Sequence, residues 1–345
     1  MKKIILSLIS LSLSLNCFAE EKVNLVASIK PLQLVAQELI GDLGEVEVLI
    51  PAGASPHHYN LKPSDMRKLS DTDLVVWVGP SLEQFLAKTL NRHDGAVLQL
   101  LKDEEVGHHD EHEEHHDHDK AHHEDGHEEE HHADAEHGHK EHDHDHHEHE
   151  KHHEEEHHAH ESHAEEEHGE HHHDHGDNDP HLWMDPIVMI SAADQIRDEL
   201  VKKHPELKAK LDQNFASFKA EVTQADQSIQ KQLSPYKDRG FIVFHDAFAL
   251  FVEHYGLNQL AYFTFDPSQA PGAKKVAKLQ SLIKSKNAVC VFSEPQFEAA
   301  IVKRVTAGTG VNKGELDPLA IAVKPEQGYT GFIKGLADSM ENCLR

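Results

Sequence analysis

Three histidines lie at points along the chain where a predicted strand has just ended or a helical stretch is about to begin. His57 stands in a loop directly after the apolar segment 46–50, and His245 directly follows the apolar segment 241–244. His181 lies between an acidic tract and the next helical stretch. In parallel α/β sheets, ligands bind in the crevice at the carboxyl ends of the strands, so these imidazoles are candidates for one shared site.

Three imidazoles suit Zn²⁺, which takes nitrogen ligands in a tetrahedral shell that a carboxylate or water completes. Asp317 is the candidate carboxylate, from a late loop of the chain. His58 competes with His57, but neighbouring residues of an extended loop point in opposite directions, so only one of the two is expected to face the site. Spacing alone leaves a second interpretation open, in which each histidine is a surface or helix-capping residue.

The segments that would position these side chains alternate between apolar strands and helices. Strands are predicted at residues 23–28, 46–50, 74–79, 241–244, 260–265 and 288–292, and helices at 31–40, 186–203, 205–233, 248–255, 274–285 and 297–307. Continuous apolar strands that alternate with helices indicate parallel sheets covered on both faces. We therefore expect an α/β fold of two lobes, each a mostly parallel sheet flanked by helices. As one rigid helix, 205–233 would connect the lobes over about 43 Å.

Residues 107–176 consist almost entirely of His, Glu, Asp, Ala, Gly and Lys, and they hold 29 of the 36 histidines of the chain. They contain no Leu, Ile, Phe, Trp, Tyr or Pro, so they cannot bury enough apolar surface to offset the entropy of ordering. We expect a disordered insert, rich in metal ligands, on a folded body.

The net charge of −29 belongs to this part of the chain. The stretch 103–179 carries 32 acidic residues against three lysines, and the remainder is balanced. The sequence therefore has no basic footprint for nucleic acid.

The beginning of the chain has the pattern of a secretory signal peptide. Two lysines precede the apolar run 4–15, which is too short to span a bilayer, and small residues precede a cleavage position after Ala19. Lipidation at Cys17 is the alternative, but Asn16 is a poor substitute for the small residue that a lipoprotein site needs. We expect a soluble protein outside the cytoplasm.

Removal of the signal peptide leaves two cysteines, Cys290 and Cys343. An even count in an exported chain favours one disulfide, and the alternative is a pair of buried free thiols. A role as metal ligands is less attractive, because neither cysteine lies near a second Cys or His in the sequence.

Several motifs, in order along the chain, resemble those of the zinc-binding periplasmic proteins of bacterial ABC uptake systems (the ZnuA type). They are Pro51-x-Gly-x-Ser-Pro-His57-x-Tyr59 with Pro63-Ser64-Asp65, Asp179-Pro180-His181-Leu182-Trp183, Val243-Phe244-His245-Asp246-Ala247-Phe248, Phe292-Ser293-Glu294-Pro295-Gln296 and Gly314-x-Leu316-Asp317-Pro318-Leu319. The resemblance extends over essentially the whole mature chain, and an acidic, histidine-rich insert at this place is itself typical of the family.

The resemblance implies metal ligands at His57, His181 and His245. Manganese-binding relatives place a carboxylate where His245 stands, and imidazole there fits zinc. Asp317 matches a position where some relatives supply a carboxylate. Because Pro56 stands where some relatives have an acidic residue, Asp317 or water becomes the expected fourth ligand.

The resemblance also implies a pairing of Cys290 with Cys343 and a function. The protein would capture zinc with high affinity in the periplasm, as a monomer, and deliver it to the inner-membrane ABC permease of a zinc importer. The insert would act as a low-affinity zinc collector, and no enzymatic activity is expected.

Two other classes of function compete with this interpretation. The zinc-protease signature His-Glu-x-x-His occurs five times within residues 112–157, but a tract made of His and Glu produces it by chance, and it requires a packed helix. A metal-dependent hydrolase at the three-histidine site would need a general base, for which Glu294 is the candidate. A secreted zinc store or chaperone without a transporter shares every feature of the sequence.

These features predict the domain organisation. A signal peptide at 1–19 precedes an N-terminal α/β lobe at 20–185, which carries the insert 107–176. A helical connector at 186–235 leads to a C-terminal α/β lobe at 236–345.

Overall fold

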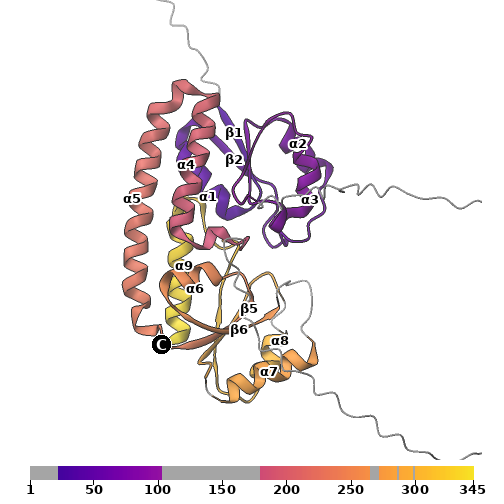
Figure 1. Cartoon of the computed structure of the whole chain (residues 1–345), viewed down its shortest axis with the longest axis vertical. Helices are drawn as coiled ribbons and strands as arrows, with labels where there is room; N and C mark the ends of the chain where they lie inside the picture. The colour runs from indigo at the N-terminus through magenta and orange to yellow at the C-terminus, as the bar shows by residue number, and fades with distance from the viewer. Residues whose placement is uncertain (1–21, 103–178, 265–271, 286, 298–299) are drawn as a thin grey trace, which may run out of the picture. The chain divides into compact units, whose positions relative to one another are not determined.

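Two four-stranded parallel sheets form the framework of the protein (Figure 1). The computed structural model describes residues 22–102, 179–264, 272–285, 287–297 and 300–345. The first sheet has the order β2-β1-β3-β4, and the second has the order β6-β5-β7-β8. The strands are β1 (Val23–Ala27), β2 (Gly44–Val48), β3 (Leu74–Trp77), β4 (Ala96–Gln99), β5 (Gly240–His245), β6 (Asn258–Thr264), β7 (Cys290–Ser293) and β8 (Asn312–Glu315). Each lobe is thus a parallel α/β unit, as the sequence predicts.

Alternation along the strands of the first sheet directs side chains into two separate cores. Leu25 and Val76 enter the main core under helices α1 (Lys30–Ile40) and α4 (Pro186–Lys203). Their neighbours Val26 and Val75 enter a second core under helices α2 (Pro63–Ser70) and α3 (Pro80–Leu90). Both faces of the sheet are covered, which explains why its strands read as apolar runs.

The second sheet repeats this arrangement. Phe241 and Val243 of β5 enter the main core, which also receives helices α6 (Ala249–Tyr255) and α9 (Gly328–Leu344). Ile242 and Phe244 face the opposite way, into a core with helices α7 (Ala273–Lys284) and α8 (Ala300–Thr306). Phe244 lies between the rings of Phe263 and Phe297 there, at centroid distances of 5.9 and 5.5 Å.

Helix α5 (Lys208–Leu233) is the long connector that the sequence predicts. It packs against α1 and α4 of the first lobe and against α9 of the second, and its apolar face joins a hydrophobic core that continues through both lobes. Its 26 residues span about 39 Å. A continuous core makes this connector a rigid element.

The connector begins three residues later than the predicted helix 205–233. Pro205–Leu207 form a separate 3-10 turn, because a residue before proline avoids the helical region and proline has no N–H to donate. His204 accordingly has φ −127° and ψ 68°, which ends α4.

Strand β2 begins and ends two residues earlier than the predicted strand 46–50. The α-helices and strands that the sequence does not predict are α2, α3, β4, β8 and α9. Strand β8 has the sequence Asn-Lys-Gly-Glu, which contains no apolar run. It is the edge strand of its sheet and pairs only with β7, so its conformation comes from the ladder and not from its own composition.

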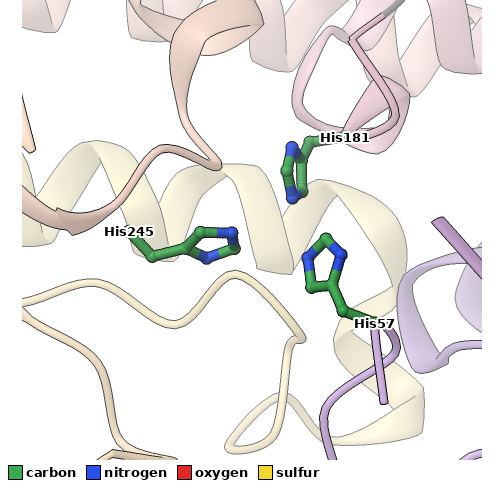
Figure 2. Close-up of side chains that lie close together, drawn as sticks. All are labelled: His57, His181 and His245. Atoms are coloured by element: carbon green, nitrogen blue, oxygen red, sulfur yellow. The ribbon is translucent and has the colours of Figure 1, made fainter. Parts of the chain in front are cut away.

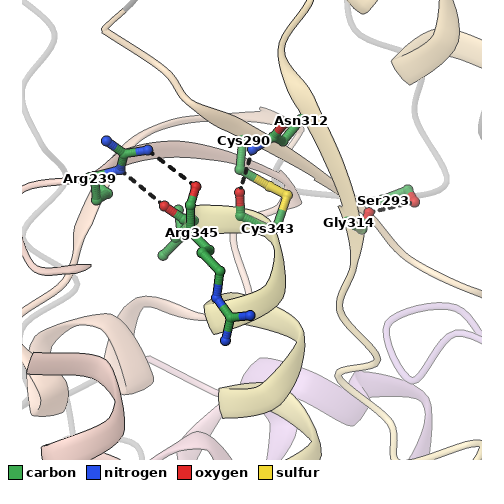
Figure 3. The surroundings of a disulfide bond; sticks show 8 residues. Arg239, Cys290, Ser293, Asn312, Gly314, Cys343 and Arg345 are labelled. Atoms are coloured by element: carbon green, nitrogen blue, oxygen red, sulfur yellow. Dashed lines mark hydrogen bonds between the residues drawn. A yellow bond between two sulfur atoms is a disulfide. The ribbon is translucent and has the colours of Figure 1, made fainter. Parts of the chain in front are cut away.

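Cys290 and Cys343 form a disulfide with a Cα–Cα distance of 5.8 Å, which confirms that prediction. It links β7 to the last turn of α9 (Figure 3). Asn312 Nδ2 donates to the carbonyl of Cys343 at 2.9 Å, and Arg239 Nε donates to the carbonyl of Leu344 at 3.0 Å. Arg239 Nη2 also donates to the carbonyl of Arg345 at 3.4 Å. The end of the C-terminal helix is therefore held to the second sheet and to the residue before β5 by one disulfide and three hydrogen bonds.

The predicted signal peptide, the histidine-rich insert and the five His-Glu-x-x-His motifs lie outside the described residues. Within the parts of the chain that are described, no helix is long and apolar enough to cross a membrane.

A half-buried carboxyl group lies where α1 meets α9. Glu38 Oε1 accepts a hydrogen bond from the backbone N–H of Tyr329 at 2.6 Å. A Cβ at residue 328 would collide with this carboxylate, and Gly328 has φ +61°, so glycine is required for the approach. Burial raises the pKa of Glu38 to about 7, against the backbone hydrogen bond, with nearby Glu221 adding to the rise.

We expect Glu38→Gln to change how stability depends on pH. A raised folded pKa gives stability that is complete below the unfolded value of 4.5 and is lost as pH rises through about 7. Relative to the variant, the native protein should lose roughly 3 kcal/mol of unfolding free energy between pH 4.5 and about 8. Urea unfolding of both proteins across this range measures the difference, and a constant difference would contradict the assignment.

Candidate metal centre

His57, His181 and His245 come together in the folded chain. Each offers one ring nitrogen, and these three atoms lie within 4.8 Å of one another. The ring centroids are 5.0–5.5 Å apart, and Figure 2 shows the three rings converging from separate segments of the chain. Among the described residues, this is the one group of His, Cys, Asp or Glu side chains with a geometry that could hold a metal ion.

The loop after β2 carries His57 and is tied to helix α2. Asp65, near the start of α2, accepts from the backbone N–H of Lys62 at 2.8 Å and from the Tyr59 hydroxyl at 3.0 Å. The Tyr59 ring also packs edge-on against Phe85 of α3, at a centroid distance of 5.8 Å. These contacts hold the loop close to the sheet. His58 is exposed and lies outside the cluster, as the alternation along the loop predicts.

His181 is positioned by the short segment that precedes α4. Asp179 Oδ1 accepts from the His181 backbone N–H at 2.9 Å and lies 2.8 Å from His181 Nδ1. This carboxylate holds the proton on Nδ1, which leaves Nε2 as the lone-pair donor. Asp185 caps α4 by accepting from the N–H groups of Ile187 and Val188. Trp183 Nε1 donates to the carbonyl of Pro318 at 2.7 Å, so the segment is also bound to the second lobe.

His245 is the last residue of β5 and is 4% exposed. Its Nδ1 lies 3.6 Å from Oε1 of Glu294, a carboxylate just after β7 that is 2% exposed. Strands β5 and β7 are adjacent and parallel, so their carboxyl ends bring these two residues together.

Burial dominates the electrostatics of the cluster. It lowers the pKa of His181, although Asp179 acts in the opposite direction, so the imidazole is held neutral and able to bind metal. Burial also raises the pKa of Glu294, and the interaction with His245, which lowers this pKa, opposes the rise. A metal ion would supply the positive charge that this environment lacks.

The space between the rings is a cavity of ≈ 10 Å³, which is about the volume needed for a single water-sized sphere. It is bounded by the three histidines and by Ser55, Pro56, Trp183, Gln296, Phe297, Pro318 and Leu319. No carboxylate of the described residues lines it. The cavity therefore suits an ion with nitrogen ligands.

Asp317, the predicted fourth ligand, does not join the cluster of described ligand atoms. Its Oδ1 accepts from the N–H of Leu319 at 3.1 Å, and its Oδ2 accepts from the N–H of Ala322 at 3.1 Å. The carboxylate thus stabilises the turn that follows it, which includes Ala320, a non-glycine residue with φ +55°. Burial raises the pKa of Asp317, and these backbone hydrogen bonds oppose the rise.

Asp179 and Glu294 are the carboxylates whose relation to the imidazoles sequence reasoning did not find. Asp179 stands two residues before His181, a spacing that allows its side chain to reach the ring from a turn. The sequence suggests only a general-base role for Glu294, because a contact between side chains at the ends of two adjacent strands cannot be read from a single sequence.

Two parallel-sheet lobes joined by a rigid helix, with three imidazoles gathered at an ion-sized cavity, define a solute-binding protein of an uptake transporter. The family model of the zinc-uptake complex component A, periplasmic (ZnuA), matches residues 25–343. The chain belongs to this family.

Curated relatives agree with that assignment, and a solved structure shares the fold. The chain is 43% identical over 322 residues to the high-affinity zinc uptake system protein ZnuA of Haemophilus influenzae, covering 93% of both chains. It is 33% identical over 347 residues to the protein of the same name from Yersinia pestis, covering 96% of this chain and 94% of the relative. A crystal structure of ZnuA has the same fold, with a TM-score of 0.67 at 23% identity, covering 94% of this chain and all of that one.

We expect Asp317→Asn to leave the affinity for a divalent ion such as Zn²⁺ within about tenfold of the native value. The reason is that both carboxylate oxygens already accept from backbone N–H groups. Competition titration with a zinc chelator measures the affinity. A loss on the order of 100-fold or more, the scale of losing a ligand, would restore Asp317 to the coordination shell.

Proposed function

We propose that the protein captures Zn²⁺ in the periplasm and delivers it to the ABC permease of a zinc importer in the inner membrane. The observation that carries the proposal is the convergence of three imidazoles on an ion-sized cavity that no carboxylate of the described residues lines. Nitrogen ligands favour zinc, whereas oxygen ligands suit manganese and magnesium. The names of the relatives, which are high-affinity zinc uptake proteins, point the same way.

In this proposal His57, His181 and His245 are the metal ligands, and water or Asp317 completes the shell. Family membership supports the transporter as partner. A hydrolase at this site would need space for a substrate beside the metal, and a cavity of ≈ 10 Å³ between the rings favours ion capture instead.

The remaining assignments follow from the sequence. Residues 1–19 act as a cleaved signal peptide, and residues 107–176 act as a low-affinity collector that raises the zinc concentration near the cluster. The folded lobes extend over 20–185 and 236–345, with the connector at 186–235, and the protein works as a monomer. A flexible tether gives a high effective concentration without adding contacts at the tight site.

Replacing His57 with Ala tests the ligand set. Two imidazoles remain, so zinc affinity should fall by more than the roughly 10–100-fold that follows loss of an outer-shell partner. The measurement is chelator competition in a background that lacks residues 107–176, since the insert would otherwise mask the loss. His58→Ala is the matched control, because His58 is adjacent but exposed. Equal affinity of His57→Ala and its parent would refute the site.

Deletion of residues 107–176 tests the collector. The deleted protein should keep one tight zinc equivalent and lose several weak ones, because solvated histidines bind metal in shifting combinations at the cost of ordering the chain. Equilibrium dialysis with metal analysis counts the equivalents in both proteins. The same number of bound ions with and without the insert would rule the collector out.

A further inference from the structure

Two buried carboxylates stand behind the histidine cluster instead of inside its cavity. Asp179 is 5% exposed and Glu294 is 2% exposed, and neither lines the cavity between the rings. Asp179 contacts Nδ1 of His181, and Glu294 approaches Nδ1 of His245. In both histidines the atom that faces a carboxylate is therefore Nδ1, and the two carboxylates belong to different lobes.

For His181 the hydrogen bond between the carboxylate and the ring is already formed. The distance from Nδ1 to Asp179 Oδ1 is 2.8 Å, a normal hydrogen bond, and His181 Nε2 is buried with no hydrogen-bond partner among the described residues. The ring thus has its proton on the outer nitrogen and its lone pair on the inner one.

For His245 the corresponding carboxylate lies in place, but the hydrogen bond to the ring is not formed. Nδ1 and Glu294 Oε1 lie 3.6 Å apart, and in the described part of the chain both atoms, together with His245 Nε2, are buried without a hydrogen-bond partner. About 0.7 Å separates this distance from the ~2.9 Å of an ordinary N–H···O bond. Buried polar atoms without partners are costly and rare, so a pair of them facing each other calls for an explanation.

Metal binding supplies one, because an ion bound to Nε2 of His245 leaves the ring proton on Nδ1, facing the carboxylate. Ligand nitrogens in a tetrahedral zinc shell with bonds of 2.0–2.1 Å lie about 3.4 Å apart, whereas the three candidate atoms here are spread over distances of up to 4.8 Å. The rings must therefore reorient when an ion binds, and a tilt of the His245 ring can bring Nδ1–H to Glu294.

We propose that Glu294 is a positioning residue that forms its hydrogen bond with His245 Nδ1–H when the ion is bound, matching the preformed bond of Asp179 to His181. The inference rests on the proposed function of the three-histidine site. Together the two carboxylates orient two Nε2 atoms toward the ion and place negative charge behind a ligand set that has none. The cavity itself stays free of carboxylate oxygens, which preserves the preference for zinc over oxygen-seeking ions.

The test compares Glu294→Leu and Glu294→Gln in the full chain by chelator competition for the tight zinc equivalent. Glu294→Leu removes the acceptor, and the affinity should fall roughly 10–100-fold. Glu294→Gln keeps an acceptor oxygen and loses only the charge, so its affinity should fall less. Glu294 Oε2 also accepts from Gln296 Nε2 at 2.7 Å. Thermal unfolding without metal therefore measures the structural cost of each variant separately from its loss of zinc affinity.

Glu83→Gln is the matched control. Glu83 is fully buried, but its oxygens accept from Ser28 Oγ and the N–H of Gly79 and not from an imidazole, so zinc affinity should not change.

Visible spectra of the first Co²⁺ equivalent report directly on the coordination geometry. The intense bands of a tetrahedral site should weaken in Glu294→Leu and persist in Glu83→Gln. If Glu294→Leu and Glu294→Gln bind zinc as tightly as the native protein while His57→Ala does not, the inference fails and the proposed function stands. If the native protein has no tight equivalent, the proposed function fails first.

Discussion

The close approach of three imidazole rings is the constraint on which the site depends. Rings with centroids 5.0–5.5 Å apart cannot all carry a proton without strong repulsion, so the empty site must be held neutral. Burial lowers the pKa of His181, which favours the neutral form of that ring. The result is a set of lone pairs ready for a cation.

The same constraint explains where the carboxylates lie. A carboxylate inside the cavity would stabilise protonated imidazoles and would also bind oxygen-preferring ions. Asp179 and Glu294 instead stand on the far side of their rings, and Asp317 is engaged by the N–H groups of its own turn. Negative charge is thus close enough to favour a bound dication without entering its coordination shell.

The two lobes are joined by more than the connector. Lys30, at the start of α1, donates to the carbonyls of Ile321 and Val323 in the loop after Asp317, at 3.1 and 2.6 Å. Trp183 is bonded to Pro318 of the same region, and the hydrophobic core runs through both lobes. A large rotation of one lobe against the other would break these hydrogen bonds and the shared core.

The sequence by itself determined the α/β class, the two sets of parallel strands, the long connector and the candidate histidines, because buried strands and helices have distinct apolar patterns. It also indicated the pairing of Cys290 with Cys343. It did not reveal β8, whose polar residues are extended only because β7 pairs with them. Nor did it reveal how Glu294 faces His245, or that Asp317 turns back to its own backbone. Those relations arise between strand ends and across turns, where distance in space is independent of distance along the chain, and only the tertiary structure decides them.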